Sequence, residues 1–308
     1  MPKMTDERLL TGDLSKSDAA IYKLTDDLCG IFTLDVFTPI VDDPETFGRI
    51  VFANSVSDIC AMGGQPLLAL NIALFPREIE TSKLADILKG CALAALEHNV
   101  LIVGGHTAKD QEVKYGLSVF GTANPSQLRL SNMAKPEQAI ILTKPLGTGI
   151  LYAAREKIDF NQCVPSMTQV NCKASRILSA YDCKCATDVT GFGFAVSLYE
   201  LLNESGISAD VNVSGIPLFP DTLEMAKIYT CPVLMDNILS VESKLKIDPK
   251  LPPEWTNIIG DAQTSGGLLA FIDADKADDC LKKLLKSGIQ AGIVGYAKQG
   301  KPEIRISF

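Results

Sequence analysis

The spacing of apolar and polar residues along the chain predicts alternating strands and helices. Residues 21–24 and 29–41 are two runs rich in Ile, Val, Phe and Thr, separated by a polar turn, as is typical of strands. Residues 45–62 change to a helical spacing of apolar side chains and end at two consecutive glycines. Further elements follow: a buried strand over 67–74, a helix over 82–99, a strand that runs into a glycine-rich loop over 100–110, and a strand over 114–122.

The polar stretch 124–138, with two prolines, predicts a domain boundary. Beyond it the pattern predicts a strand at 139–144, helices at 167–181 and 194–203, a strand at 207–213, a helix near Leu223, a strand at 268–273, a helix at 276–287 and a strand at 291–297. The chain has 308 residues, and domains usually have roughly 100–200 residues. We therefore predict two α/β (α+β) domains, 1–130 and 131–308.

Composition narrows the classes of function. The net charge is −8, without a long run of Lys or Arg, so binding of nucleic acid is not expected. No apolar stretch reaches the length that spans a membrane, and the first ten residues carry acids where a signal peptide needs an apolar core. We expect a cytoplasmic protein whose nine cysteines are reduced. Cys183 and Cys185 have no second pair that would complete a metal site.

Five short polar segments contain aspartate, and all but the first also contain glycine: 15–20, 55–64, 104–110, 186–193 and 261–267. Glycine lets the backbone approach a ligand closely, and its N–H groups can surround phosphate oxygens. Aspartate binds phosphate through a metal ion, and Mg²⁺ prefers such oxygen ligands. The pattern therefore favours a magnesium–nucleotide site. Each residue alone also fits an ordinary role in the fold: Asp18 as a helix cap, Asp58 as a surface acid and His106 as a structural residue.

Neither a P-loop nor a dinucleotide fingerprint is present. Several motifs instead occur in the order found in one family: LDVFTPIVDDPETFGRI, SVSDICAMGG, GGHT, LTKPLGTG, ATDVTGFG and DAQTSGGLLAFI. From about Asp6 to the C-terminus the chain resembles the selenophosphate synthetases (selenide, water dikinases). The resemblance implies the two-domain fold of aminoimidazole ribonucleotide synthetase, with an N-terminal sheet domain that forms a homodimer. It also implies the reaction of ATP, selenide and water to selenophosphate, AMP and orthophosphate, catalysed by a phosphotransferase with paired acceptors.

The same resemblance implies the site residues. Asp18, Asp58 and Asp188 match the magnesium ligands of the family. The positions that contact ATP match Ser15, Lys16, Ser17, Asp35, Asp58, Gly105, His106 and Thr107.

The chain also departs from the family pattern. Ser17 stands where the family usually has a second acid, Val196 and Ser197 replace Gly-His, and a Gly-Gly-Thr element is absent near residues 231–237. The loop that carries the catalytic Cys or selenocysteine, and a Lys needed for turnover, would precede Met1. We therefore expect this chain to be truncated and poorly active, for example because a selenocysteine codon was read as a stop. Cys29 and Cys60 are expected to be inert buried thiols. The alternatives are a non-catalytic nucleotide-binding paralogue and a related ATP-using enzyme.

Overall fold

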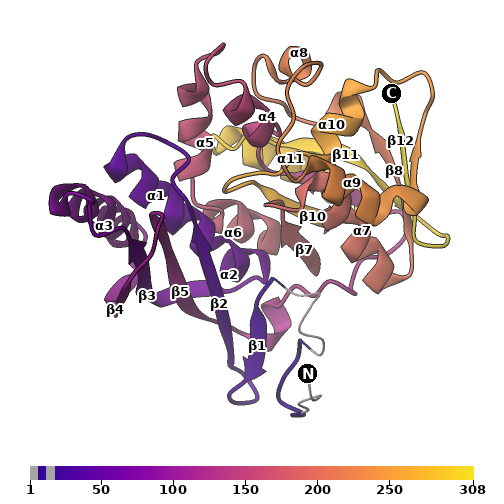
Figure 1. The fold of residues 1–308 in the computed structure, drawn as a ribbon. Helices are drawn as coiled ribbons and strands as arrows, with labels where there is room; N and C mark the ends of the chain where they lie inside the picture. The colour runs from indigo at the N-terminus through magenta and orange to yellow at the C-terminus, as the bar shows by residue number, and fades with distance from the viewer. Residues whose placement is uncertain (1–5, 12–17) are drawn as a thin grey trace. The chain divides into compact units, whose positions relative to one another are not determined.

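A computed structural model describes residues 6–11 and 18–308, so the predicted ATP contacts Ser15, Lys16 and Ser17 lie outside the described residues. The chain forms two compact units (Figure 1). The first comprises Met1–Leu128 together with the short segment Met167–Cys172. The second comprises Arg129–Ser166 and Lys173–Phe308.

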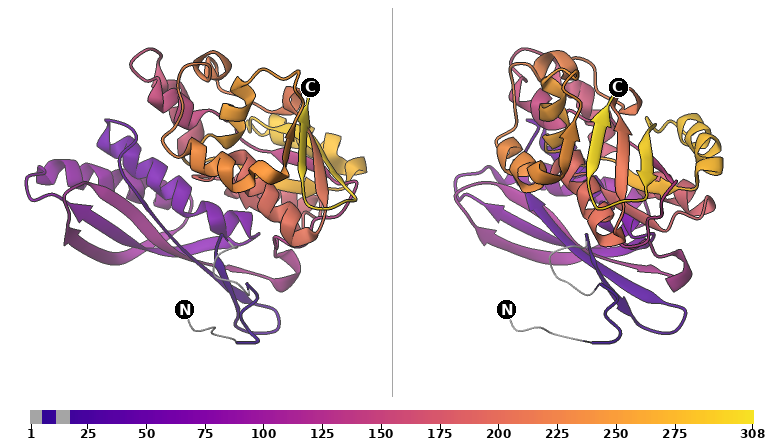
Figure 2. Two further views of the ribbon diagram at one scale, coloured as in Figure 1. Left: turned by 45° about the vertical axis from the view of Figure 1, so that its right-hand side comes forward. Right: turned by 90° about the vertical axis from the view of Figure 1, so that its right-hand side faces the viewer.

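The first unit contains a five-stranded sheet in the order β1-β2-β5-β3-β4. All neighbouring strands are antiparallel except β3 and β4, which are parallel and joined by α3. Helices α1 and α3 pack together on one face of this sheet, and no helix of the described first unit covers the opposite face (Figure 2). The bounds are β1 (Ala20–Lys23), β2 (Cys29–Phe37), α1 (Pro44–Ser55), α2 (Ser57–Ala61), β3 (Gln65–Phe75), α3 (Thr81–Glu97), β4 (Leu101–Lys109) and β5 (Lys114–Ala123).

The helix predicted over 45–62 is divided into two helices. It starts as the sequence suggests, because the Asp43 carboxylate accepts a hydrogen bond from the Thr46 N–H at 2.8 Å and Pro44 occupies the first turn. The break falls at Val56, which separates α1 from α2. Gly63, at φ 80°, then ends α2, a conformation that glycine adopts without strain. Asp58 consequently lies on its own short helix.

The glycine-rich loop predicted within 100–110 is wrong, because β4 continues through Gly104 and Gly105 to Lys109. Pairing with β3 keeps this segment extended, and Gly105 lies opposite Asn71. A Cβ on Gly105 would lie 2.2 Å from the Asn71 carbonyl oxygen, and φ there is 150°. Glycine at this position therefore serves close strand pairing.

The second unit contains a seven-stranded sheet in the order β7-β10-β6-β11-β8-β12-β9. Its strands are mainly antiparallel, and only β12 pairs in parallel, with β8 and β9. The bounds are β6 (Ala139–Leu142), β7 (Cys185–Asp188), β8 (Ser208–Asn212), β9 (Leu245–Ile247), β10 (Leu268–Ile272), β11 (Gly292–Lys298) and β12 (Ile304–Ser307).

Helices α7, α9 and α10 pack on one another beside this sheet, with Phe194, Ile258 and Phe271 in the shared core. Helix α11 contacts β6 and β11 and lies on the other face (Figure 2). The helices that follow Leu128 in sequence are α4 (Thr148–Ala153), α5 (Val164–Thr168), α6 (Cys172–Ala180), α7 (Gly193–Ser205), α8 (Thr222–Met225), α9 (Leu234–Val241), α10 (Glu254–Gly260) and α11 (Ala274–Lys286). Short 3₁₀ turns lie at Pro125–Gln127, Phe160–Cys163, Val213–Gly215 and Glu242–Lys244.

One cysteine pair differs from the expectation of reduced thiols. Cys60 and Cys172 are joined by a disulfide, so the interpretation of Cys60 as an inert thiol is wrong. Both belong to the first unit, where Asn171 Nδ2 also donates to Ser57 Oγ at 2.8 Å. The two cysteines are 112 residues apart in sequence, and only the return of Met167–Cys172 to the first unit brings them together.

Among residues 6–11 and 18–308, no helix combines the length and the apolar character needed to cross a bilayer.

Candidate functional site

Thr33 lies between two of the predicted magnesium ligands in the first unit. Its hydroxyl donates a hydrogen bond to Asp58 Oδ2 and also lies 3.5 Å from the main-chain carbonyl oxygen of Asp18. Thr33 is buried on β2, and Asp58 is 9% exposed at the start of α2. The strand, the helix and the segment before β1 therefore converge on this hydroxyl, which brings the backbone of Asp18 near the Asp58 side chain.

Asp35 lies near this pair, whereas the predicted ATP contacts on β4 do not. Because side chains alternate along a strand, Asp35 is on the same face of β2 as Thr33. In the strand register, Asp35 of β2 is opposite Leu117 of β5, Leu117 is opposite Asn71 of β3, and Asn71 is opposite Gly105 of β4. Three strand spacings separate Asp35 from Gly105, or about 14 Å. Gly105, His106 and Thr107 are exposed on the edge strand, and one nucleotide would have to span this distance to reach both groups.

In the second unit, three glycine-containing motifs meet at one edge of the sheet. Strands β6 and β7 both pair antiparallel with β10, so both end at the edge where β10 begins. Thr143 N–H donates to the Leu268 carbonyl at 3.0 Å, and Val189 N–H donates to the Gly267 carbonyl at 2.9 Å. The turn at 264–267 is thus joined by hydrogen bonds to the loops after both strands.

Asp188, the third predicted magnesium ligand, is the last residue of β7 and is 5% exposed. The chain then turns through Thr190–Phe192 into α7, and Gly193 has a φ of 75° in this turn. Asn237 of α9 supports the turn, because its amide donates to the Gly191 and Gly260 carbonyls, each at 3.0 Å. A carboxylate at the end of a strand beside an exposed glycine turn is well placed to meet a metal ion and phosphates.

The glycine turn before α4 is held by side chains of the 261–267 motif. Gln263 Oε1 accepts from the Gly147 and Thr148 N–H groups at 3.0 and 3.2 Å. Asp261 Oδ2 accepts from the Gly149 N–H at 3.1 Å. These are N–H groups that a helix start leaves without backbone partners. Gln263 and Asp261 therefore fix the loop between β6 and α4.

Asp261 is fully buried, and this burial affects the protonation of its carboxyl group. Burial raises the pKa of its carboxyl group from 3.8 to about 7, although the hydrogen bonds from Gln263 and the backbone oppose this effect. Its Oδ1 atom has no hydrogen-bond partner in the described part of the chain. The protonated form is therefore favoured well above the ordinary range of an aspartate.

Lys144 is a second buried ionisable group at the same edge. It is 2% exposed, and its Nζ donates to the Ser265 carbonyl at 2.7 Å. Burial lowers the pKa of Lys144 to about 7, while the nearby charge of Asp188 acts to raise it. The Lys144 charge thus lies close to the predicted ligand Asp188.

Reasoning from the sequence missed four residues that support these loops: Thr33, Lys144, Asn237 and Gln263. A signal exists for Lys144, because a cation stands two residues after the apolar run 139–142 and precedes a glycine turn. Gln263 lies inside a motif that the sequence did single out. For Asn237 we find no local signal, since its two acceptors lie in other segments of the chain.

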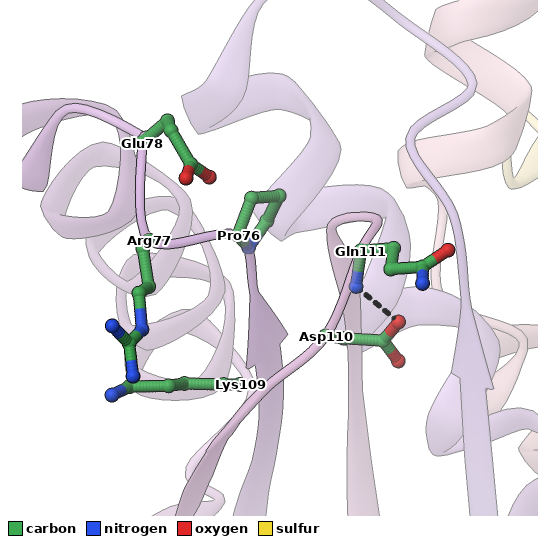
Figure 3. Close-up of a pocket in the computed structure, with 6 residues that line it drawn as sticks. All are labelled: Pro76, Arg77, Glu78, Lys109, Asp110 and Gln111. Carbon is green, nitrogen blue, oxygen red and sulfur yellow. Dashed lines mark hydrogen bonds between the residues drawn. The ribbon is translucent and has the colours of Figure 1, made fainter.

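A surface hollow of about 650 Å³ lies in the first unit, beyond the ends of β3 and β4 (Figure 3). The side chains of Arg77 and Lys109 both line it, while Asp110 accepts from the Gln111 N–H at 2.6 Å. Glu78 and Asp110 balance the two positive charges, so the lining has no net charge that would favour an anion. None of the predicted site residues lines this hollow.

The donor set suits magnesium that arrives together with phosphates. In the described residues, no three His, Cys, Asp or Glu side chains form a ready-made metal cage. Asp18 and Asp58 belong to the first unit and Asp188 to the second. Mg²⁺ commonly takes only one or two carboxylates and completes its shell with water and substrate phosphates. The chemistry of these oxygen donors therefore fits Mg²⁺ bound with a nucleotide.

We predict that Asp261→Asn stabilises the protein in a pH-dependent way. The pKa of Asp261 is higher in the folded than in the unfolded chain, so the unfolded chain loses its proton first as the pH rises. This group therefore lowers the free energy of unfolding progressively between about pH 4 and pH 7, by at most about 4 kcal/mol. The gain from the variant should be roughly two- to threefold larger at pH 8 than at pH 5, measured by urea unfolding.

The matched control is Asp278→Asn on the exposed side of α11, which should give a gain near zero at both pH values. An equal effect of Asp261→Asn at pH 5 and pH 8 would contradict the prediction.

Comparison with known proteins identifies the family. The family model described as AIR synthase related protein, N-terminal domain, matches residues 16–123, and its C-terminal counterpart matches residues 135–307. Selenide, water dikinase 2 of Peptoclostridium acidaminophilum is 40% identical over 302 residues, which cover 96% of this chain and 87% of that protein. Selenide, water dikinase of Clostridioides difficile (strain 630) is 38% identical over 296 residues, covering 94% and 85%.

Solved structures show the same fold at lower identity. Thiamine-monophosphate kinase from Stenotrophomonas maltophilia K279a aligns with a TM-score of 0.71 and 16% identity, over 98% of this chain and 92% of that one. The hydrogenase maturation protein HypE aligns with a TM-score of 0.70 and 18% identity, over 97% and 89%. The predicted α/β fold, like that of aminoimidazole ribonucleotide synthetase, is thus confirmed. The chain belongs to the selenide, water dikinase family.

Proposed function

We propose that this chain binds Mg–ATP and uses it to convert selenide and water to selenophosphate, with release of AMP and orthophosphate. The observation that carries the proposal is the position of the Thr33 hydroxyl, which donates to the Asp58 carboxylate and lies 3.5 Å from the main-chain carbonyl oxygen of Asp18, within a chain of this family. Relatives that are 38–40% identical and span nearly the whole chain bear the name selenide, water dikinase.

In this proposal Asp18, Asp58 and Asp188 hold the magnesium ion. Bound there, Mg²⁺ would neutralise charge on the phosphate oxygens. The chain's own residues orient the ligands, because Thr33 donates to one of the two carboxylate oxygens of Asp58 and so fixes the direction of that group. Asp35, on the same face of β2, is assigned to the nucleotide.

The cysteines of this chain give little support for a nucleophile that delivers selenium. All seven cysteines outside the disulfide are buried. Burial raises the pKa of several of these thiols, to about 12 for Cys91, Cys163 and Cys280. A thiol reacts as the thiolate, so such groups are poor nucleophiles near neutral pH. We therefore propose that this chain by itself binds Mg–ATP but forms selenophosphate slowly.

Calorimetry with Mg–ATP tests the assignment of the metal ligands. We expect wild-type protein to bind, and Asp18→Ala/Asp58→Ala to bind at least tenfold more weakly, because two of the three proposed carboxylate ligands are lost. The control is Asp86→Asn, an exposed acid on α3, which should bind like wild type. Affinity of the double variant equal to that of wild type would refute the assignment, and ³¹P NMR after addition of selenide would show whether selenophosphate forms.

Thr33→Val should weaken metal binding while leaving the three carboxylates in place. Loss of a partner that orients a metal ligand typically lowers metal affinity about 10–100-fold. The measurement is titration with Mn²⁺ in the presence of ADP. Thr33→Ser keeps the hydroxyl and should retain most of the affinity, so equal losses in Thr33→Val and Thr33→Ser would argue against the role of the hydrogen bond.

We also propose that the protein forms a homodimer through the uncovered face of the first sheet. Apolar side chains on β2, β3 and β4 are exposed on this face: Phe32, Leu34, Leu68, Leu70, Leu101 and Val103. They alternate with buried neighbours along β2, as expected for a strand with two apolar faces. Contiguous exposed apolar surface of this kind usually marks an interface, and most soluble homo-oligomers are two-fold dimers.

Leu34→Asp/Leu70→Asp should convert this dimer to a monomer of 33.1 kDa, because two charges on each copy would become buried at the interface. Light scattering coupled to size exclusion measures the mass. Leu96→Asp is the control, since Leu96 is an exposed apolar residue on α3, away from the sheet face. A wild-type protein with the monomer mass, or a double variant that stays dimeric, would contradict this interface.

A further inference from the structure

Lys144 is a buried lysine near the candidate site, and its ammonium group makes few hydrogen bonds. Its Nζ donates to the Ser265 carbonyl at 2.7 Å, and Ser265 Oγ lies at 3.5 Å. In the described part of the chain no carboxylate forms an ion pair with it, although Asp188 is near enough to influence its charge. The Lys144 side chain thus contacts the 264–267 turn and lies within electrostatic range of Asp188.

Keeping this ammonium group in the interior is costly. Moving a charge out of water costs several kcal/mol even after the protein relaxes, and one carbonyl acceptor does not offset that cost. A methionine would fill a similar volume without the penalty. A purely structural side chain at this position would therefore be better replaced by an apolar one, so the charge or the donor of Lys144 has a role at this edge of the sheet.

The neighbours of Lys144 indicate what it acts on. Ser265 has a φ of 49°, which is unusual for a residue with a side chain, and the bond from Lys144 holds its carbonyl. Gly267 packs so tightly that a Cβ there would lie 2.4 Å from the Lys144 backbone nitrogen. Gly267 in turn accepts the hydrogen bond from Val189, the residue after Asp188. Lys144 therefore lies beneath both the 264–267 turn and the end of β7.

We propose that Lys144 is a positioning residue that places its ammonium group beneath Asp188 and the 264–267 turn, so that this edge of the sheet accepts phosphate groups. The identity of the phosphate ligand rests on the function proposed above. Lys144 is buried and does not touch the ligand itself. It fixes the turn through the Ser265 carbonyl and balances the negative charge of Asp188 until a metal ion arrives.

This role has a signature that damage to the fold does not share. A buried positive charge repels a metal cation and attracts an anion through the low-dielectric interior. Removing it should therefore strengthen binding of a divalent cation alone and weaken binding of a nucleotide without metal. Loss of structure would weaken both.

Three substitutions separate the charge from the hydrogen bond. Lys144→Met removes both, Lys144→Gln keeps a donor without charge, and Lys144→Arg keeps charge and donors. Lys282→Met, an exposed lysine on α11, is the control for net charge. At pH 6, below the pKa of Lys144, each protein is titrated with Mn²⁺ alone and with ADP in the presence of a chelator. Thermal unfolding establishes that each variant is folded.

We expect Lys144→Met and Lys144→Gln to bind ADP about tenfold more weakly and Mn²⁺ several-fold more tightly than wild type. Lys144→Arg and Lys282→Met should resemble wild type. Folded neutral variants that lose affinity for both probes, or for neither, would overturn the inference. A wild-type protein that fails to bind Mg–ATP would instead overturn the proposed function, so the two failures are distinguishable. If Lys144→Met does not fold, the comparison of Lys144→Gln with Lys144→Arg carries the test.

Discussion

A charged group inside a protein costs several kcal/mol unless dipoles or opposite charges surround it, and the loops of this chain are arranged around that cost. Asp58 is nearly buried and receives the Thr33 hydroxyl. Asp261 receives the N–H of Gly149 and the amide of Gln263, and Lys144 reaches the carbonyl of Ser265. Apart from the Gln263–Asp261 bond, which lies within one loop, each bond joins a loop or helix of the candidate site to a neighbouring segment of the fold. The same bonds therefore stabilise the fold and position the candidate site.

The predictable part of the fold is the part with local causes. Periodic apolar spacing located the strand β3, the helix α3 and the helix α11 close to their observed bounds. The missed elements have little local signal, since the short strands β7, β9 and β12 and the helices α9 and α10 depend on pairing or packing with distant segments. Gly104 and Gly105 looked like a loop by composition, and only the pairing with Asn71 explains why they continue a strand.

The site divides in the same way. The carboxylates Asp18, Asp35 and Asp58 could be found from the sequence because they accompany glycine or apolar runs and match the family motifs. Their support could not be found, because the Thr33 hydroxyl is recognisable only when α2 folds back against β2. The Cys60–Cys172 pair has the same origin, since its two halves are brought together by the tertiary fold alone. Contacts between segments far apart in sequence are thus where the sequence was least informative.

The fold by itself does not determine which reaction the protein catalyses. Proteins named thiamine-monophosphate kinase and HypE share this fold at 16–18% identity, so their likeness establishes architecture alone. Charge gives a more specific constraint. The chain has a net charge of −8, which opposes the approach of an unneutralised nucleotide. The carboxylates of Asp18, Asp58 and Asp188 add to that repulsion locally, and a bound metal ion would reverse it. In the proposed role, Lys144 compensates the charge of Asp188 at a pH below about 7, the pKa to which burial lowers its ammonium group. An acidic protein can therefore present a phosphate-accepting edge, provided that a buried cation lies beneath the turn that the phosphates would approach.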